Sequence, residues 1–247
     1  MITKFIKRIL RRDPMVKHTQ ANNTGAPKRI PKKIHRIDPH LLSKNAIKVT
    51  DTLQQAGFEA FIVGGAVRDL ALGISPKDFD VATNATPDQV QRLFRRARLI
   101  GRRFQIVHVT FFGKGHPEII EVSTFRALLD NAGDHIAESG RILRDNVWGS
   151  QGEDAARRDF TINAMYYDPS SETVLDYHGG MADMQKKTLR MIGDPAKRYR
   201  EDPVRMLRAI RFAAKTGFAL DKATLAPIAK LSNLLQDVPP ARLFDEI

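Results

Sequence analysis

The chain contains no cysteine and no long apolar run. The absence of cysteine excludes disulfides and thiolate-bound metals, and it is typical of a protein in a reducing, cytoplasmic setting. No stretch reaches the roughly 20 apolar residues that a membrane-spanning helix requires. With 42% hydrophobic residues among 247, the chain can still form one large domain, or one domain with an extension, without cross-links.

Acidic residues are almost absent from the first 36 positions. That segment holds eleven Lys and Arg against Asp13 alone, a charge of +10, whereas the remaining residues together carry only +2. Because residues 13–40 are also interrupted by four prolines, we predict a flexible basic arm over residues 1–40. Such a polycation binds phosphates, so we expect the arm to contact RNA. The candidate RNA contacts within it are Lys28, Arg29, Lys32 and Lys33.

The start of the arm allows a second interpretation. Ile2, Phe5, Ile6 and Ile9 recur at helical spacing with basic residues between them. A short amphipathic helix of this kind can lie on an anionic membrane surface. We therefore expect a cytoplasmic protein that is peripheral at the inner membrane if this helix forms, and a plain solvated tail is the third interpretation.

The rest of the chain alternates strands with helices and then continues as helices. Residues 128–152 have little periodicity and many polar residues, so we predict a long mobile loop there. The order predicts a mixed α/β head over 41–168, with a small mixed β-sheet and flanking helices, followed by a helical neck over 169–247. Within the head, helices are predicted over 41–57, 67–72 and 86–98, and strands over 59–63, 77–82, 106–112 and 118–125.

The residues with the clearest chemistry are two glycines and two carboxylates. Gly64 and Gly65 end an apolar run, and glycines let backbone N–H groups come close to phosphate oxygens. Asp78 and Asp80 supply hard oxygen ligands for Mg²⁺. On a strand both would share one face, roughly 6.6–6.8 Å apart along it, which suits two metal ions about 3.5–4 Å apart. The pattern predicts metal-dependent handling of a nucleoside triphosphate, with Asp78 and Asp80 as metal ligands.

These motifs continue along the chain. Five segments follow one another between residues 41 and 247: GGAVRDLALG…KDFDVAT, EIIEVSTFR, RRDFTINAMYY, DYHGGMADMQKKTLRMIGDP and RYREDPVRMLRAIRFA. In this order they resemble the class II branch of the bacterial tRNA nucleotidyltransferase/poly(A) polymerase superfamily. The resemblance implies an α/β nucleotidyltransferase head, an all-helical neck, and two Mg²⁺ ions held by Asp78 and Asp80. One ion would activate an RNA 3′-hydroxyl and the other would bridge the triphosphate. Because family members continue into a helical body, the resemblance also implies that this body is missing here.

The same resemblance assigns further residues to the site. Glu121 and Asp159 would complete the catalytic carboxylates; the alternatives are an exposed strand residue for Glu121 and a helix N-cap for Asp159. There are two further alternatives. Arg68 and Asp69 could form a structural ion pair, and Arg157 and Arg158 could lie on a solvated face. The implied nucleotide-binding residues are Gly64, Gly65, Arg68, Arg157, Arg158 and Asn163.

A further prediction concerns the base of the nucleotide. Asp202-Pro203 is a good helix start, and Asp202 and Arg205 lie three residues apart, hence on one helix face. A carboxylate accepts from an exocyclic amino group and a guanidinium donates to a ring nitrogen, a pattern that adenine and cytosine offer and guanine and uracil do not. With Glu201 and Arg208, this pair predicts ATP or CTP as substrate. A capped neck helix whose arginines face solvent is the alternative.

One more resemblance separates members of the superfamily. The stretch LIGRRFQIVHV at 99–109 is similar to bacterial poly(A) polymerases rather than to CCA-adding enzymes, and its Arg102 and Arg103 are candidate RNA contacts. The prediction is template-independent addition of AMP from ATP to RNA 3′ ends, linked to RNA processing and decay, with Mg²⁺ as cofactor. A CCA-adding tRNA nucleotidyltransferase and a non-catalytic RNA-binding protein on the same scaffold are the alternatives. The sequence names no protein partner.

Overall fold

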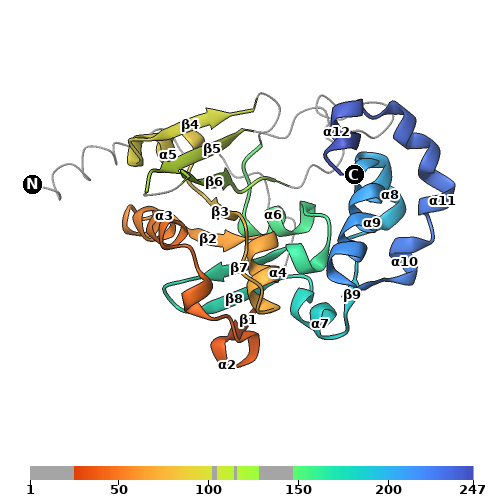
Figure 1. Cartoon of the computed structure of the whole chain (residues 1–247), viewed down its shortest axis with the longest axis horizontal. Coiled ribbons are helices and arrows are strands. Elements are labelled where there is room, and N and C mark those ends of the chain that lie inside the picture. The colour runs from red at the N-terminus through yellow and green to blue at the C-terminus, as the bar shows by residue number, and fades with distance from the viewer. Residues whose placement is uncertain (1–24, 102–104, 114–115, 128–146, 247) are drawn as a thin grey trace, which may run out of the picture.

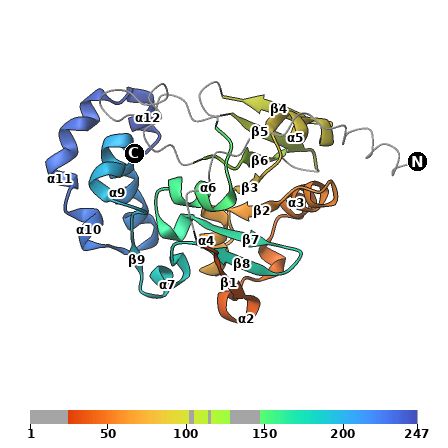
Figure 2. The same cartoon turned by 180° about the vertical axis from the view of Figure 1, so that it is seen from behind.

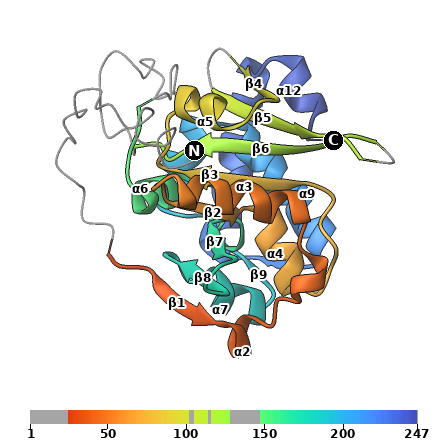
Figure 3. The ribbon, with the colours of Figure 1, turned by 90° about the vertical axis from the view of Figure 1, so that its left-hand side faces the viewer.

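One mixed sheet forms the body of the structure, a computed structural model that describes residues 25–101, 105–113, 116–127 and 147–246. Its strands are β1 (Lys28–Pro31), β2 (Ala60–Val63), β3 (Phe79–Thr83), β4 (Ala97–Ile100), β5 (Ile106–Phe111), β6 (Glu118–Thr124), β7 (Met165–Asp168) and β8 (Thr173–Asp176). Within the described residues these eight strands follow the order β1-β8-β7-β2-β3-β6-β5-β4 (Figure 1). β3 and β6 are parallel and the other neighbours antiparallel, and Figure 3 shows them one beside another. The predicted mixed sheet is confirmed.

Two helices cover one face of this sheet. α3 (Lys44–Gln55) packs on β2, β3 and β6, and α5 (Pro87–Leu93) packs on β4, β5 and β6. Both helices begin at side-chain caps: Ser43 for α3, and Thr86 with Gln89 in a capping box for α5. Their apolar sides join buried strand residues such as Val81 and Ile120 in the main core. The sequence pattern of alternating buried residues therefore sets which strand face the helices cover.

The other face carries a smaller hydrophobic cluster near the middle of the sheet. Ala155 of α6 (Gln151–Arg157) meets Val63, Ala82, Phe125 and Tyr166 there. Helix α4 (Gly65–Ala71) follows β2 directly and contacts the short 3₁₀ helix η3 (Thr161–Asn163). Residues from three parts of the chain, on and beside α4, α6 and η3, thus lie at one end of strands β2 and β3.

The neck helices gather beside the sheet, on the right in Figure 1 and on the left in the reverse view of Figure 2. They are α8 (Pro195–Glu201), α9 (Val204–Thr216), α10 (Lys222–Leu225), α11 (Ile228–Leu231), η4 (Ser232–Asp237) and α12 (Pro240–Phe244). The long helix α9 packs on both α8 and α12. A short parallel pair, β9 (Thr188–Leu189) with β10 (Ala219–Leu220), adds strands to the predicted helical neck. Among the described residues, no helix is long and apolar enough to cross a membrane.

The flexible-arm prediction is wrong for the part of the arm that the structure describes. Residues 28–31 form β1, which pairs with β8 and places the buried Ile30 opposite Val174. α2 (Lys32–His35) and the 3₁₀ helix η1 (Pro39–Leu41) follow, and His35 is buried with Nε2 2.9 Å from the carbonyl oxygen of Glu172. The cause is long-range, because β8 offers an open backbone edge to this segment. Residues 1–24, with the predicted amphipathic helix, lie outside the described residues.

Three predicted boundaries also differ from the structure. The helix over 86–98 ends at Leu93, because the chain turns extended and residues 97–100 pair with β5. The loop over 128–152 ends at Ser150, whose capping box with Glu153 starts α6, while 128–146 lie outside the described residues. The head does not stop at residue 168, because β8 completes its sheet, and α7 (Gly180–Gln185) follows.

Candidate active site

The predicted site residues meet in one cleft between the sheet and the neck helices. Its volume is about 970 Å³, near the upper end of the range for small-molecule sites. Ten Lys and Arg line it against six Asp and Glu, so the cleft attracts an anion. All the predicted catalytic and nucleotide-binding residues line it except Glu121 and Glu201.

The carboxylates lie at the end of the cleft formed by β3. Asp80 is on β3 and Asp78 immediately precedes that strand, while Phe79 between them is buried in the core, as the two-residue period predicts. Glu121 of β6 is the direct neighbour of Asp80 across the parallel pair. Burial, together with the charges of Glu121 and Asp78 and against that of Arg158, raises the pKa of Asp80 to about 6. Burial is the largest of these causes, and the two neighbouring carboxylates add to it.

This carboxylate pair has the donor set of a Mg²⁺ site completed by a ligand. In the described part of the chain, no three His, Asp or Glu side chains are grouped so that they could hold a metal ion by themselves. Mg²⁺, however, is commonly bound through one or two carboxylates together with substrate phosphates. Asp78 and Asp80 supply such a pair of carboxylates, with Glu121 beside Asp80.

Gly64 has a backbone conformation that favours glycine. Its backbone has φ +76° and ψ −136°, a conformation open to glycine, at the start of α4. A Cβ added at Gly64 would lie 3.6 Å from Asp80 Oδ2 and 3.7 Å from Arg158 Nη1. The backbone of Gly64 thus lies between a candidate metal ligand and a candidate phosphate ligand.

Replacing Gly64 by alanine should weaken ATP binding and destabilise the fold. The positive φ costs about 1–3 kcal/mol for a residue with a Cβ, and the added methyl contacts Asp80 and Arg158. Gly73→Ala is the matched control, because Gly73 has φ +72° with nothing within 4 Å of an added Cβ. We expect both variants to unfold at lower urea concentration, but only Gly64→Ala to raise the Kd for ATP. Equal ATP affinities for the two variants would contradict a role of Gly64 in binding the triphosphate.

A buried network orients Arg158. Its Nη2 and Nε donate to Asp154 Oδ2 at 2.8 and 3.2 Å, and Tyr166 Oη donates to the same oxygen at 2.7 Å. Burial opposes ionisation of Asp154, yet the charges of Arg158 and Arg157 outweigh it and lower the pKa of Asp154. Arg158 is therefore fixed on one side, which leaves its Nη1 toward Gly64 and Asp80.

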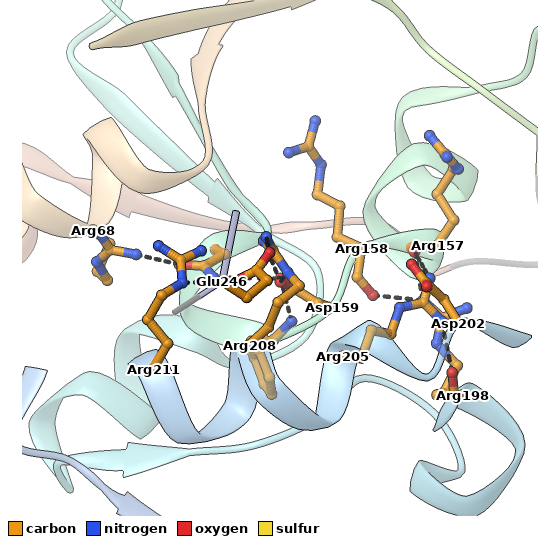
Figure 4. Close-up of polar contacts among 12 residues, drawn as sticks. Arg68, Arg157, Arg158, Asp159, Arg198, Asp202, Arg205, Arg208, Arg211 and Glu246 are labelled. Carbon is orange, nitrogen blue, oxygen red and sulfur yellow. Dashed lines mark hydrogen bonds and ion pairs between the residues drawn. The ribbon is translucent and has the colours of Figure 1, made fainter. Parts of the chain in front are cut away.

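Asp159 forms an ion pair with a neck arginine, Arg208, instead of joining the other candidate acids. Its Oδ2 accepts from Arg208 Nε at 2.9 Å and Nη2 at 2.8 Å, and its Oδ1 accepts from the amide N–H of Phe160 and from Asn163 Nδ2 (Figure 4). Burial opposes ionisation, but the charge and hydrogen bonds of Arg208 lower the pKa of Asp159. Asp159 is not the N-cap that the sequence allowed, because η3 begins after Phe160.

Two further acids organise the arginines of the cleft. Glu246, which follows α12, binds Arg208 Nη1 at 2.8 Å and Arg211 Nε at 2.7 Å. Asp69 binds Arg68, whose side chain is only 2% exposed and whose Nη1 donates to Asn163 Oδ1 at 2.7 Å. The structural ion pair proposed for Arg68 and Asp69 is present, and it leaves Arg68 on the cleft wall.

The predicted base-reading pair lies at the neck end of the cleft. Asp202-Pro203 directly precedes α9, so the predicted helix start is confirmed, although Asp202 caps neither α8 nor α9 with its side chain. Its Oδ2 accepts from Arg242 Nη2 at 3.0 Å, whereas its Oδ1 is buried and has no hydrogen-bond partner among the described residues. Arg205 donates from Nη1 to Glu201 Oε2 at 3.1 Å (Figure 4 shows Arg205 beside Asp202). An orphaned buried carboxylate oxygen is costly, and a ligand amino group would satisfy it.

The remaining candidates divide into those outside the cleft and those the sequence missed. Lys28, Arg29, Lys32 and Lys33 are on β1 and α2 at the far edge of the sheet, and Arg102 and Arg103 lie outside the described residues. The spacing of Arg205, Arg208, Arg211 and Lys215 along α9 could have indicated one basic helix face. Nothing local marked Arg242, Glu246 or Asp154. The charged lining residues beyond those predicted are Asp69, Lys77, Arg126, Arg211, Lys215, Arg242 and Glu246.

Comparison with known proteins places this cleft in a family. A model described as the poly A polymerase head domain matches residues 60–190, which is more than half of the chain. The chain belongs to the poly A polymerase head-domain family. A second model, described as the probable RNA and SrmB-binding site of polymerase A, matches residues 217–247. That match includes Arg242 and Glu246, so the segment matched by this second model contributes side chains to the cleft.

Curated and solved relatives agree with this family. Poly(A) polymerase I of Salmonella typhi is 55% identical over 222 residues, 88% of this chain and 47% of the relative. The CCA-adding enzyme of Bacillus subtilis is 41% identical over 197 residues, 80% of this chain and 47% of the relative. The crystal structure of the Bacillus stearothermophilus CCA-adding enzyme in complex with CTP has a TM-score of 0.69 at 34% identity, covering 85% of this chain and 48% of that chain. The chain thus spans about half the length of the relatives it matches.

Proposed function

We propose that this chain transfers AMP from ATP to the 3′ ends of RNA without a template. The observation that carries the proposal is the cleft itself, with carboxylates at one end and the orphaned Oδ1 of Asp202 beside Arg205 at the other. A nucleoside triphosphate has matching ends, a phosphate chain that needs cations and an amino-bearing base edge. The higher identity to poly(A) polymerase I than to CCA-adding enzymes favours ATP over CTP.

In this function the RNA 3′-oxygen attacks the α-phosphorus of ATP, the bond to the β-phosphate oxygen breaks, and pyrophosphate leaves. Mg²⁺ held by Asp78 and Asp80 would lower the pKa of the attacking hydroxyl and neutralise phosphate charge. Arg158, fixed by Asp154, stabilises the charge that develops on the phosphates. The arginines of α9 line the same cleft and attract the triphosphate.

The base is selected by how many hydrogen bonds it makes with the polar groups of Asp202 and Arg205. Adenine places its N6 amino group where Asp202 Oδ1 needs a donor, and its N1 accepts from Arg205. Guanine and uracil present a carbonyl oxygen there and leave the carboxylate unpaired. CCA addition is the second candidate, because cytosine offers the same edge and the solved relative above was crystallised with CTP.

The test offers an unstructured RNA with Mg²⁺ and each nucleoside triphosphate in turn. We expect a ladder with ATP alone, and Asp202→Asn should raise the KM for ATP roughly 10- to 100-fold, equivalent to about 1–3 kcal/mol. Asp194→Asn is the control, since Asp194 caps α8 outside the cleft. Incorporation of CTP, or extension only of tRNA that lacks its 3′ end, would support CCA addition instead. No incorporation with any nucleotide would contradict the proposed function for this chain.

A further inference from the structure

A row of polar side chains leads away from the candidate metal ligands across the sheet. Asp80 on β3 is beside Glu121 on β6, Glu121 is opposite His108 on β5, and His108 is opposite Arg98 on β4. Residues in register on neighbouring strands point to the same face. His108 Nε2 lies 3.3 Å from Glu121 Oε1, which confirms that these two side chains share that face.

This face of β4, β5 and β6 is open to solvent. Helices α3 and α5 pack on the opposite face, where Val107, Val109 and Ile120 are buried. On the face of the row, by contrast, the side chain of Glu121 is 49% exposed and Ile119 is 45% exposed. We call this surface, made by Arg98, Ile106, His108, Thr110, Ile119 and Glu121, the outer face.

The position of the outer face is defined relative to the nucleotide cleft. The cleft includes Asp80 but not Glu121, so it extends from β3 toward β2, α4 and α9. In phosphoryl transfer the attacking and leaving oxygens are roughly in line, on opposite sides of the phosphorus. With the triphosphate in the cleft, the β6 side of Asp80, which is the outer face, is an open side from which an in-line hydroxyl can arrive.

The chemistry of the outer face fits a nucleic-acid strand. Arg98 is an exposed cation on the strand next to His108 and directly opposite it. Cations contact phosphates without regard to base sequence. Ile106 and Ile119 add apolar surface against which a sugar or a base can pack. We propose that the outer face binds the 3′-terminal nucleotides of the RNA acceptor, with Arg98 on a phosphate and His108 beside the last ribose. This inference rests on the proposed function for the direction of attack.

Replacing Arg98 tests the outer face without touching the cleft. Arg98→Ala should raise the KM for RNA roughly 3- to 10-fold and lower the slope of log affinity against log salt by about one, because one phosphate contact is lost. The KM for ATP should stay within about twofold. Arg92→Ala is the matched control, because Arg92 is an exposed arginine on α5, on the opposite side of the same strands. A changed salt slope is a readout that a purely structural role of Arg98 would not produce.

Photo-crosslinking locates the RNA directly. An RNA with a photoreactive base at its last position should crosslink to peptides of β5 or β6. Crosslinks to α5, or equal RNA affinities for Arg98→Ala and Arg92→Ala, would overturn the inference. So would a change of oligomeric state in Arg98→Ala with unchanged RNA affinity, which would make the face a protein interface.

The proposed function and this inference fail separately. Arg98-dependent binding and crosslinking of RNA, without AMP addition by the unaltered protein, would contradict the function and keep the RNA site. AMP addition that is unaffected by Arg98→Ala, with no crosslink to β5 or β6, would contradict the RNA site and keep the function.

Discussion

Replacing Asp80 by asparagine is expected to abolish nucleotide transfer and to stabilise the free protein at neutral pH. Transfer should fall roughly 10³-fold or more, because a metal ligand and its charge stabilisation are lost together. Stability should rise because burial and the nearby carboxylates penalise the ionised Asp80. Asp51→Asn on α3, outside the cleft, is the matched control and should change neither property.

The pH dependence of that stability gain follows from the direction of the pKa shift. Folding raises the pKa of Asp80 from 3.8 to about 6, so the folded state binds this proton more tightly than the unfolded state. The contribution of Asp80 to stability is therefore fully present below pH 3.8 and is lost as the pH rises through about 6. Asparagine removes the penalty, so the gain should be on the order of 3 kcal/mol at pH 8 and should nearly vanish at pH 4.

Urea unfolding at pH 4, 6 and 8, beside the RNA extension assay, measures both effects. ATP with Mg²⁺ should raise the melting temperature of the unaltered protein and have a much smaller effect on Asp80→Asn, since binding to the folded state stabilises it. Extension by Asp80→Asn at the normal rate would exclude Asp80 as a required ligand. A variant no more stable at pH 8 than the unaltered protein would show that its charge is already balanced.

Replacing Asp159 by asparagine should instead reduce stability more than chemistry. The carboxylate is 10% exposed, and each of its oxygens accepts two hydrogen bonds: Oδ2 from Arg208, and Oδ1 from Phe160 N–H and Asn163 Nδ2. The NH2 group of an asparagine would therefore face donors in either orientation. Breaking a buried pair from one side costs about 3 kcal/mol. Because folding lowers the pKa of Asp159, its contribution to stability is present above its ordinary pKa of 3.8 and is lost in stronger acid.

The kinetic signature separates this role from catalysis. Loosening Arg208 should raise the KM for ATP while kcat falls by less than about 10-fold, far less than for Asp80→Asn. Glu246→Gln, which removes the other carboxylate on Arg208, should show the same pattern more weakly. A stable Asp159→Asn protein whose kcat falls as far as that of Asp80→Asn would restore Asp159 as a catalytic acid.

Much of the local architecture was accessible from sequence because it depends on neighbours a few residues apart. The two-residue strand period placed Phe79 in the core and both aspartates at the cleft. Thr86 and Pro87 marked the start of α5 through local capping geometry. The capping box of Ser150 and Glu153 is equally local, but the loop predicted over 128–152 included Ser150 and so missed the start of α6.

The start of α9 and the two residues of the base-reading pair were predicted from local sequence, and both residues line the same cleft. The contacts of Asp202, in contrast, depend on the tertiary structure. Its Oδ2 is held by Arg242, 40 residues later, which leaves Oδ1 buried and unpartnered. Helical spacing alone contains no information about such a partner.

The sequence by itself determined the strand and helix pattern, the two glycines before α4 and the carboxylates at 78 and 80, since these follow from backbone periodicity and local hydrogen bonding. Only the tertiary structure decided which charges meet. It paired strand β1 with β8, placed Glu121 beside Asp80, and formed the ion pair between Asp159 and Arg208. The physical reason is that an ion pair depends on distance in space, and chain folding brings together residues whose separation in sequence carries no period.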